Sequence, residues 1–238
     1  RSAEFVLNRM GEALFGSRFI TAEPDAKVEA LATAFREHPF VIVMGGAKVS
    51  DKIGAIRNLL GNADCLLVGG AMAYTFLKEQ GKSVGNSKVE DDKIQLAGEL
   101  LDQYGDKILL PVDHVCAAEI AEDADTQVAD DEIPEGMIGL DIGPKTAELY
   151  ADKVMEAKLA TWNGPMGYFE IEAFRRGTAA VAKAMAECGG TSIIGGGETA
   201  ESVEMLGLQE EVSHVSTGGG ACLEFLAGKA LPGIAVLE

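Results

Sequence analysis

Two lysines follow the first of several glycine-rich corners in this chain. Residues 45–52 have the sequence GGAKVSDK, which places Lys48 and Lys52 four residues apart on one face of a helix beginning there. Like charges at this spacing cost about 0.2–0.5 kcal/mol, and cations at a helix N-terminus cost about 0.3–1 kcal/mol more. A bound phosphate reverses the sign of both effects. The pair indicates an anion site; a solvated lysine pair partly compensated by Asp51 is the alternative.

Bare backbone amides recur wherever an apolar run stops. Glycine lets an N–H group approach a ligand without a Cβ in the way, and a helix that starts next adds further donors and a partial positive charge. Five such corners in one chain favour phosphate binding over ordinary turns. They are residues 44–48, 68–72, 163–167, 194–198 and 216–220.

Two glutamates have neighbours that suit nucleotide chemistry. Glu198 beside Thr199 pairs a carboxylate with a hydroxyl, and Mg²⁺ prefers such hard oxygen ligands. An acidic residue in the first turn of a helix explains Glu198 equally well. Glu170 ends the nonapeptide 162–170, which holds the only tryptophan, and its carboxylate could accept hydrogen bonds from a ribose. A packed tryptophan and a surface glutamate are the alternative there.

Two known phosphate motifs were tested against the chain. The spacing Gly-x-x-x-x-Gly-Lys-Ser/Thr is absent, so this is not a P-loop NTPase. Residues 195–200, GGGETA, satisfy the dinucleotide pattern Gly-x-Gly-x-x-Ala, which also expects an acidic residue at the end of the next strand. The strand predicted at 212–216 leads instead into Thr217 and three glycines. A dinucleotide-binding oxidoreductase is therefore the weaker alternative.

Composition and charge exclude several classes of protein. With 20 Lys and Arg against 38 Asp and Glu, the net charge of −18 argues against nucleic acid or an anionic membrane as a partner. The 238 residues are 47% hydrophobic, enough for a core, yet no apolar run approaches the roughly 20 residues of a membrane span. Four scattered cysteines, at 65, 116, 188 and 222, predict neither a zinc site nor disulfides. We expect a cytoplasmic, monomeric protein.

Short apolar runs alternate with amphipathic stretches from residue 40 onward. This alternation predicts an α/β fold, a doubly wound, Rossmann-like parallel sheet of about six strands with helices on both faces. The acidic segment 113–139 lacks a clear period and is expected to be a solvated loop or small hairpin. We predict strands at 40–44, 64–68, 107–111, 158–162, 191–194 and 212–216, and helices at 1–20, 25–37, 50–60, 72–80, 89–104, 145–156, 172–187, 199–206 and 221–227.

Several segments together resemble phosphoglycerate kinase. They are residues 45–53, 72–77, 140–144, 162–170 and 216–225, and they match the nucleotide-binding C-terminal half of that family in order. The resemblance runs from about residue 27 to 238 and leaves 1–26 as an unmatched N-terminal helical segment. It implies a glycolytic phosphotransferase that passes phosphate between 1,3-bisphosphoglycerate and ADP, with Mg²⁺ accompanying ADP or ATP.

The resemblance also assigns roles by matched position. Lys48 resembles the lysine that follows the transferring phosphoryl group, and the amides of Gly196 and Gly219 face that group, so these three are the catalytic candidates. Glu198 is the metal-ligand candidate. The nucleotide-contact candidates are Gly46, Ala47, Lys52, Gly70, Leu140, Asn163, Pro165, Gly167, Glu170, Gly197 and Thr199.

Three positions depart from the family pattern, and one part of the family is missing. Glu198 stands where the family usually has Asp, Ala71 replaces a glycine, and Tyr168 replaces a valine near the base. The family's N-terminal half, which holds 3-phosphoglycerate, is not visible in this sequence. We therefore expect the chain to need that half for turnover; a nucleotide-binding module without activity of its own is the alternative.

Overall fold

A six-stranded parallel sheet forms the centre of the fold. The computed structural model describes residues 37–216, and the strand order is β3-β2-β1-β7-β8-β9. Every neighbouring pair is parallel, which confirms the predicted doubly wound sheet. The strands are β1 (Phe40–Met44), β2 (Cys65–Val68), β3 (Ile108–Leu109), β7 (Leu159–Asn163), β8 (Thr191–Gly195) and β9 (His214–Ser216).

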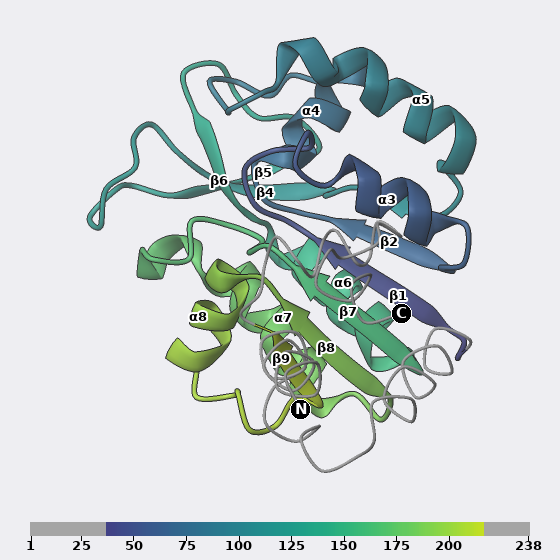
Figure 1. The fold of residues 1–238 in the computed structure, drawn as a ribbon. Helices are drawn as coiled ribbons and strands as arrows, with labels where there is room; N and C mark the ends of the chain where they lie inside the picture. The colour runs from purple at the N-terminus through teal and green to yellow at the C-terminus, as the bar shows by residue number, and fades with distance from the viewer. Residues whose placement is uncertain (1–36, 217–238) are drawn as a thin grey trace, which may run out of the picture.

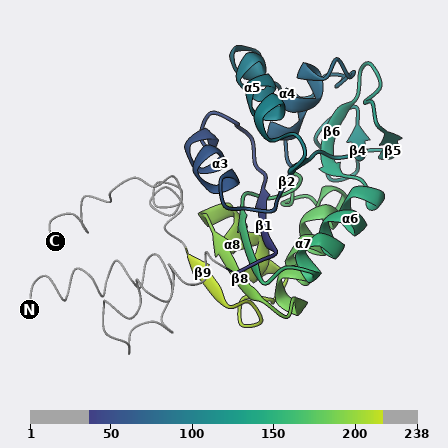
Figure 2. The same ribbon diagram turned by 90° about the vertical axis from the view of Figure 1, so that its right-hand side faces the viewer.

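Helices cover both faces of this sheet (Figures 1 and 2). Side chains of β1 alternate between the two layers: Ile42 and Met44 pack in one core, while Val41 and Val43 pack in the other. This alternation explains why the strand is apolar at every position. The first core holds α3 (Ile53–Leu60), α4 (Met72–Glu79) and α5 (Ile94–Tyr104), and the second holds α6 (Pro144–Met155), α7 (Arg176–Glu187) and α8 (Gly197–Met205).

Two of the predicted helices are divided. The helix expected at 89–104 is a short 3₁₀ turn, η2 (Asp91–Lys93), followed by α5, and that expected at 172–187 is η3 (Glu172–Phe174) followed by α7. The helices predicted at 1–20 and 221–227 lie outside the described residues, as does that at 25–37 apart from Glu37.

The acidic segment 113–139 is more ordered than the sequence predicts. It forms the expected hairpin of β4 (Asp113–Ala117) and β5 (Gln127–Asp130), but β6 (Ile138–Ile142) joins it as a third strand. The predicted hairpin is therefore present, but the prediction missed the third strand, β6. Two features hide the alternation of buried and exposed residues in this segment. Charged residues fill the hairpin tip, and the buried residues are divided between two small apolar clusters.

A buried carboxylate connects this small sheet to α6. The Asp113 side chain accepts hydrogen bonds from the backbone N–H groups of Lys145 (2.9 Å) and Thr146 (2.8 Å), and from the Thr146 hydroxyl (2.6 Å). A negative charge at the start of a helix satisfies its free amides and is stabilised by the helix dipole. The small sheet is thereby fixed beside the carboxyl ends of the main strands (Figure 1).

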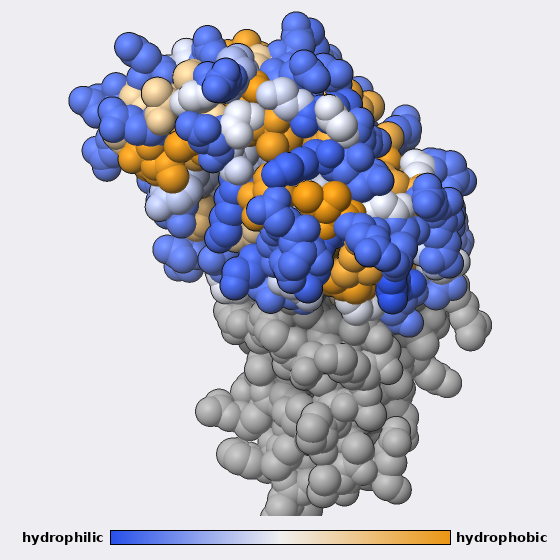
Figure 3. Space-filling view, turned by 90° about the horizontal axis from the view of Figure 1, so that it is seen from above, coloured by the Kyte–Doolittle hydropathy of each residue, from blue (hydrophilic) through white to orange (hydrophobic). Residues whose placement is uncertain are grey.

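The surface seen from above is mostly polar, with small separate apolar patches (Figure 3). The exposed large apolar side chains in the described part include Val128 and Tyr168. Among residues 37–216, no helix is long and apolar enough to span a membrane.

Replacing Tyr150 by phenylalanine should destabilise the chain by about 1–3 kcal/mol. The fully buried Tyr150 hydroxyl donates to the Val68 carbonyl oxygen (2.7 Å) and lies 2.9 Å from that of Leu109, so its loss leaves buried acceptors at the ends of β2 and β3. Urea denaturation measures the loss. The control is Tyr104→Phe, whose hydroxyl lies at the surface beside Gln103 and whose loss should cost under about 0.5 kcal/mol. Equal losses in the two variants would contradict this assignment.

Candidate functional site

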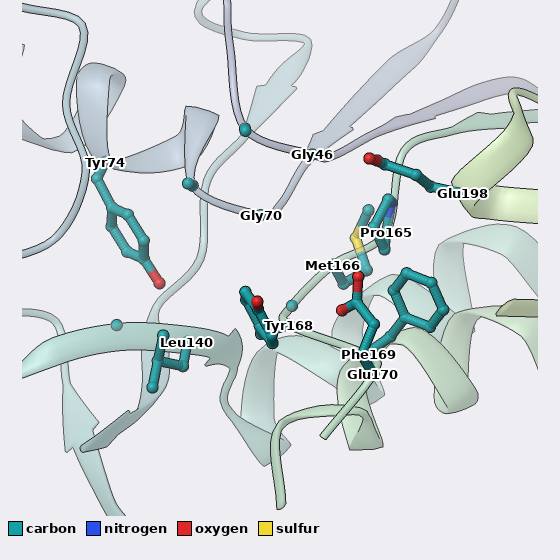
Figure 4. Close-up of a pocket in the computed structure, with 14 residues that line it drawn as sticks. Gly46, Gly70, Tyr74, Leu140, Pro165, Met166, Tyr168, Phe169, Glu170 and Glu198 are labelled. Carbon is teal, nitrogen blue, oxygen red and sulfur yellow. The ribbon is translucent and has the colours of Figure 1, made fainter. Parts of the chain in front are cut away.

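A pocket of about 180 Å³ lies at the point where the order of the strands along the sheet reverses. β1 and β7 are neighbours, but the chain continues from β1 toward β2 and from β7 toward β8, which opens a crevice at their carboxyl ends. Figure 4 shows the side chains that line it. The lining residues are Gly46, Ala47, Gly70, Ala71, Tyr74, Gly139, Leu140, Pro165, Met166, Gly167, Tyr168, Phe169, Glu170 and Glu198.

Three loops meet backbone to backbone beside this pocket. The amide of Gly46 donates to the Pro165 carbonyl (2.8 Å), and the amide of Gly70 donates to that of Met166 (2.9 Å). Gly46 and Gly70 have φ of +85° and +63°, and a Cβ at Gly70 would collide with the backbone of Gly46. Glycine is required here because a side chain would push the loops apart. These glycine-rich corners therefore build the wall of the pocket.

The Lys52 ammonium is buried behind these loops. Only 7% of the residue is exposed, and Nζ donates to the backbone oxygen of Asn163 (2.9 Å) and to its Oδ1 (2.6 Å). Burial lowers the pKa of Lys52 to about 8, although the negative charges of Glu198 and Asp51 raise it. Among residues 37–216 Lys52 makes no ion pair within 4 Å, and one of its three protons is not used in these bonds. Within the described residues, the charge of Lys52 is therefore met by neutral oxygens rather than by a carboxylate in contact with it.

Other donors gather around this ammonium, and together we call them the anion cluster: Lys52, Asn163, Gly196 and Thr199. The buried Nδ2 of Asn163 has no hydrogen-bond partner within the described part of the chain. The Thr199 hydroxyl accepts from the Gly164 amide (2.7 Å), which leaves its own proton to donate. Gly196 has φ +101°, and its own amide donates to the Ser216 carbonyl oxygen (3.1 Å), but α8 begins directly after it, so free amides of the first turn of α8 face the same region.

Two carboxylates reach the pocket from opposite sides. Glu170 and Glu198 are exposed, and Figure 4 shows both side chains directed toward the hollow. Among the described residues there is no group of three or more His, Cys, Asp or Glu that could hold a metal. A single carboxylate next to an anion site matches the way Mg²⁺ binds, with a polyphosphate and water supplying the remaining ligands. The residues present thus fit a metal that arrives with its anion.

The structure brings together most of the residues singled out in the sequence. Lys52, Asn163, Gly196 and Thr199 form the anion cluster, next to the pocket. Lys48 and Gly197 are exposed and do not line the pocket, and Gly219 lies outside the described residues. The predicted residues that line the pocket are Gly46, Ala47, Gly70, Leu140, Pro165, Gly167, Glu170 and Glu198.

Six lining residues were not among these candidates: Ala71 and Tyr168, which the sequence marks only as departures from the family pattern, and Tyr74, Gly139, Met166 and Phe169. Tyr74 lies in a motif used for the resemblance, but its helical spacing alone favours a core position. A Cβ at Gly139 would collide with the Tyr74 hydroxyl, so this glycine makes room for that hydroxyl at the pocket. Met166 and Phe169 belong to the segment 162–170, which the sequence marks only as a unit.

The chain was compared with protein families and with solved structures. A family model described as phosphoglycerate kinase matches residues 15–229. The phosphoglycerate kinase of Clostridium perfringens strain 13 is 57% identical over 205 residues, covering 85% of this chain and 52% of that protein. That of Thermosipho africanus is 56% identical over 221 residues, covering 90% and 55%. The chain therefore spans about half the length of these relatives.

Solved structures agree with this result. The structure of phosphoglycerate kinase from Coxiella burnetii superimposes with a TM-score of 0.85 at 43% identity, over 90% of this chain and 57% of that one. The enzyme of Pyrococcus horikoshii OT3 gives 0.78 at 33% identity, over 90% and 56%. The family match begins at residue 15, before residue 27 where the motif resemblance begins. The boundary proposed near residue 27 lies outside the described residues and stays a prediction.

The low pKa of Lys52 predicts how the stability of the unliganded chain depends on pH. The folded value is about 8 and the ordinary value is 10.5, so between them the unfolded state binds more protons and the free energy of unfolding rises with pH. Relative to Lys52→Met, the unaltered chain should gain stability between about pH 8 and about pH 10. Urea denaturation at both pH values measures this difference.

The exposed neighbour Lys48 supplies the control for this experiment. The stability difference between Lys48→Met and the unaltered chain should be the same at both pH values. A difference for Lys52→Met that also stays constant would show that burial does not disfavour the charged form of Lys52.

Proposed function

The chain belongs to the phosphoglycerate kinase family, and from this premise we propose that it is the nucleotide-binding half of such an enzyme. It binds ADP or ATP and takes part in phosphoryl transfer between 1,3-bisphosphoglycerate and ADP. The observation that carries the proposal is the anion cluster: a buried ammonium, an unpartnered amide, a free hydroxyl proton and a helix start converge beside one pocket. These donors match the charge and number of acceptor oxygens of a polyphosphate.

The rest of the pocket suits the remainder of a nucleotide. Tyr74 and Leu140 lie at the end away from Glu198 in Figure 4, and Tyr168 lies between them and Glu170, so a flat base has apolar and aromatic neighbours there. Glu170 extends between that end and Glu198, at a position suited to ribose hydroxyls. We therefore place the base against the small sheet and α4, the ribose at Glu170 and the phosphates at the anion cluster. Ala71 and Tyr168, which depart from the family pattern, both belong to this base end.

Phosphoryl transfer needs positioning and charge stabilisation more than covalent help from the protein. We assign Lys52, Asn163 and Thr199 to holding the nucleotide phosphates. Lys48 is exposed and four residues from Lys52, so it is free to follow a phosphoryl group that leaves the nucleotide. The resemblance gives the amides of Gly196 and Gly219 a place facing that group; in this structure the Gly196 amide donates to the Ser216 carbonyl oxygen (3.1 Å), so its proposed role requires that bond to open. The acceptor is a carboxylate, which is ionised at neutral pH, so no general base is required.

Mg²⁺ fits the remaining carboxylate of the site. Glu198 would hold the metal on the nucleotide, and the ion would neutralise charge on the phosphate oxygens. Glu198 also lowers the cost of the buried Lys52 charge, since its carboxylate favours the protonated ammonium. Glu198 therefore stabilises the charged form of Lys52 even without a ligand.

The other substrate requires residues beyond this pocket. The matched relatives are about twice as long as the matched segment, and 3-phosphoglycerate is proposed to bind on their other half. The described part of this chain supplies the nucleotide site alone. A cytoplasmic location and a monomeric state stay predictions.

Calorimetry with ADP, ATP and NADH, each with and without Mg²⁺, tests the ligand class. We expect ADP to bind, more tightly with Mg²⁺, and Lys52→Met to weaken that binding about tenfold to a hundredfold, because a charge-assisted contact is lost. The matched control is Lys107→Met, which removes a lysine that caps α3 through the carbonyl oxygens of Leu60 and Ala63. Tight NADH binding without ADP binding would instead support the dinucleotide motif at 195–200.

Turnover measurements separate the two lysines. With the N-terminal half of a phosphoglycerate kinase supplied, Lys48→Ala should lower kcat by about a hundredfold or more with little change in nucleotide affinity. Lys52→Ala should mainly weaken nucleotide affinity. Equal effects on both constants in both variants would contradict these roles, and absence of turnover with the supplied half would favour a module that only binds nucleotide.

A further inference from the structure

Arg175 binds the back of the turn that carries Glu170. Its Nε donates to the Phe169 carbonyl oxygen (2.8 Å) and its Nη2 donates to that of Glu170 (3.0 Å). A guanidinium is a rigid planar fork, so two such bonds fix the relative orientation of the two carbonyl groups. Arg175 is itself held at the junction of η3 and α7, where it is the residue before α7.

Backbone hydrogen bonds also close this turn on both sides of Glu170: the Phe169 amide donates to the Gly167 carbonyl oxygen (3.0 Å) and the Ile171 amide to that of Tyr168 (3.1 Å). The Tyr168 amide donates to the Leu140 carbonyl oxygen (2.7 Å), and the Phe169 ring is buried. Glu170 follows these anchors, its side chain is exposed, and that side chain makes no hydrogen bond within residues 37–216. The direction in which its carboxylate leaves the turn therefore depends on the peptide groups that Arg175 holds.

Arg175 uses its guanidinium on backbone carbonyl groups rather than on a carboxylate. Eight ion pairs are formed within the described residues, and none involves Arg175. Its neighbour Arg176 is exposed, whereas Arg175 is half-buried. A half-buried guanidinium that binds two neutral carbonyl groups stabilises the conformation of that turn, and it forms no ion pair with a surface carboxylate of the described residues.

We propose that Arg175 is a positioning residue for Glu170 and sets nucleotide affinity through the ribose. The proposal rests on the proposed function, in which Glu170 binds the ribose hydroxyls. Arg175 does not line the pocket, so it acts only by holding the turn. The phosphates bind at the anion cluster on other elements, and their contacts should not depend on Arg175.

The test compares three ligands on the full chain by calorimetry: ADP, 2′,3′-dideoxy-ADP and pyrophosphate, all with Mg²⁺. Arg175→Ala should weaken ADP binding about fivefold to tenfold, the loss expected when one charge-assisted contact to the ribose is misplaced. Dideoxy-ADP and pyrophosphate should bind the variant as they bind the unaltered chain. Arg175→Lys, which keeps the charge but not the fork, should recover only part of the ADP affinity.

Two further variants keep the result interpretable. Arg176→Ala, which removes the adjacent exposed arginine, should leave all three affinities unchanged. In a Glu170→Gln background Arg175→Ala should have no additional effect on ADP, because the two residues act on one contact. Hydrogen exchange of the Tyr168 and Ile171 amides should be faster in Arg175→Ala than in Arg176→Ala.

The outcomes distinguish this inference from the function on which it rests. If Glu170→Gln weakens ADP selectively but Arg175→Ala does not, the positioning role is wrong and the ribose assignment stands. If Arg175→Ala weakens pyrophosphate as much as ADP, or lowers ADP affinity further in the Glu170→Gln background, the arginine supports the fold generally and the inference is overturned. Absence of ADP binding, or no effect of Glu170→Gln, overturns both.

Discussion

A buried ammonium without an anion is the constraint on which the rest of the site depends. Lys52 is taken out of water, and within residues 37–216 its hydrogen bonds go to the two oxygens of Asn163. Burial disfavours its charged form and lowers its pKa to about 8. In the proposed function, a negative ligand would offset this cost by favouring the charged form of Lys52. This explains how a chain of net charge −18 can present an anion site.

The main sheet could be predicted because its central strands, β1 and β7, are buried on both faces. Continuous apolar runs such as 40–44 have no other simple explanation, and their glycine-rich ends mark where the strands stop. The small sheet could not be predicted by that argument. Its strands place Cys116 and Ala129 in one apolar cluster and Ala117 and Leu140 in another, and the charged residues of the hairpin obscure any period. The hydrophobic pattern of a strand predicts it well only where all of its residues are buried in the same way.

The same distinction separates the parts of the site. Gly46, Gly70 and the segment 162–170 could be found from sequence because the loops that meet there need glycine and a fixed order of residues. Tyr74 and Gly139 could not, because their pairing depends on how α4 and β6 meet in space. The carbonyl contacts of Arg175 are equally invisible in sequence, since any surface helix start can hold an arginine. Contacts between elements of separate layers require the structure.

One wall of the pocket comes from an excursion of the chain rather than from the main sheet. Gly139 and Leu140 belong to β6, which lies between β3 and β7 in the sequence, whereas the residues of the anion cluster lie at or after the ends of β1, β7 and β8. Both ends of this excursion join the main body, through β3 and through α6. A change in its length or composition would therefore leave the backbone contacts between the glycine-rich corners in place. In the proposed function, the residues near the base can therefore change in evolution independently of the residues near the phosphates.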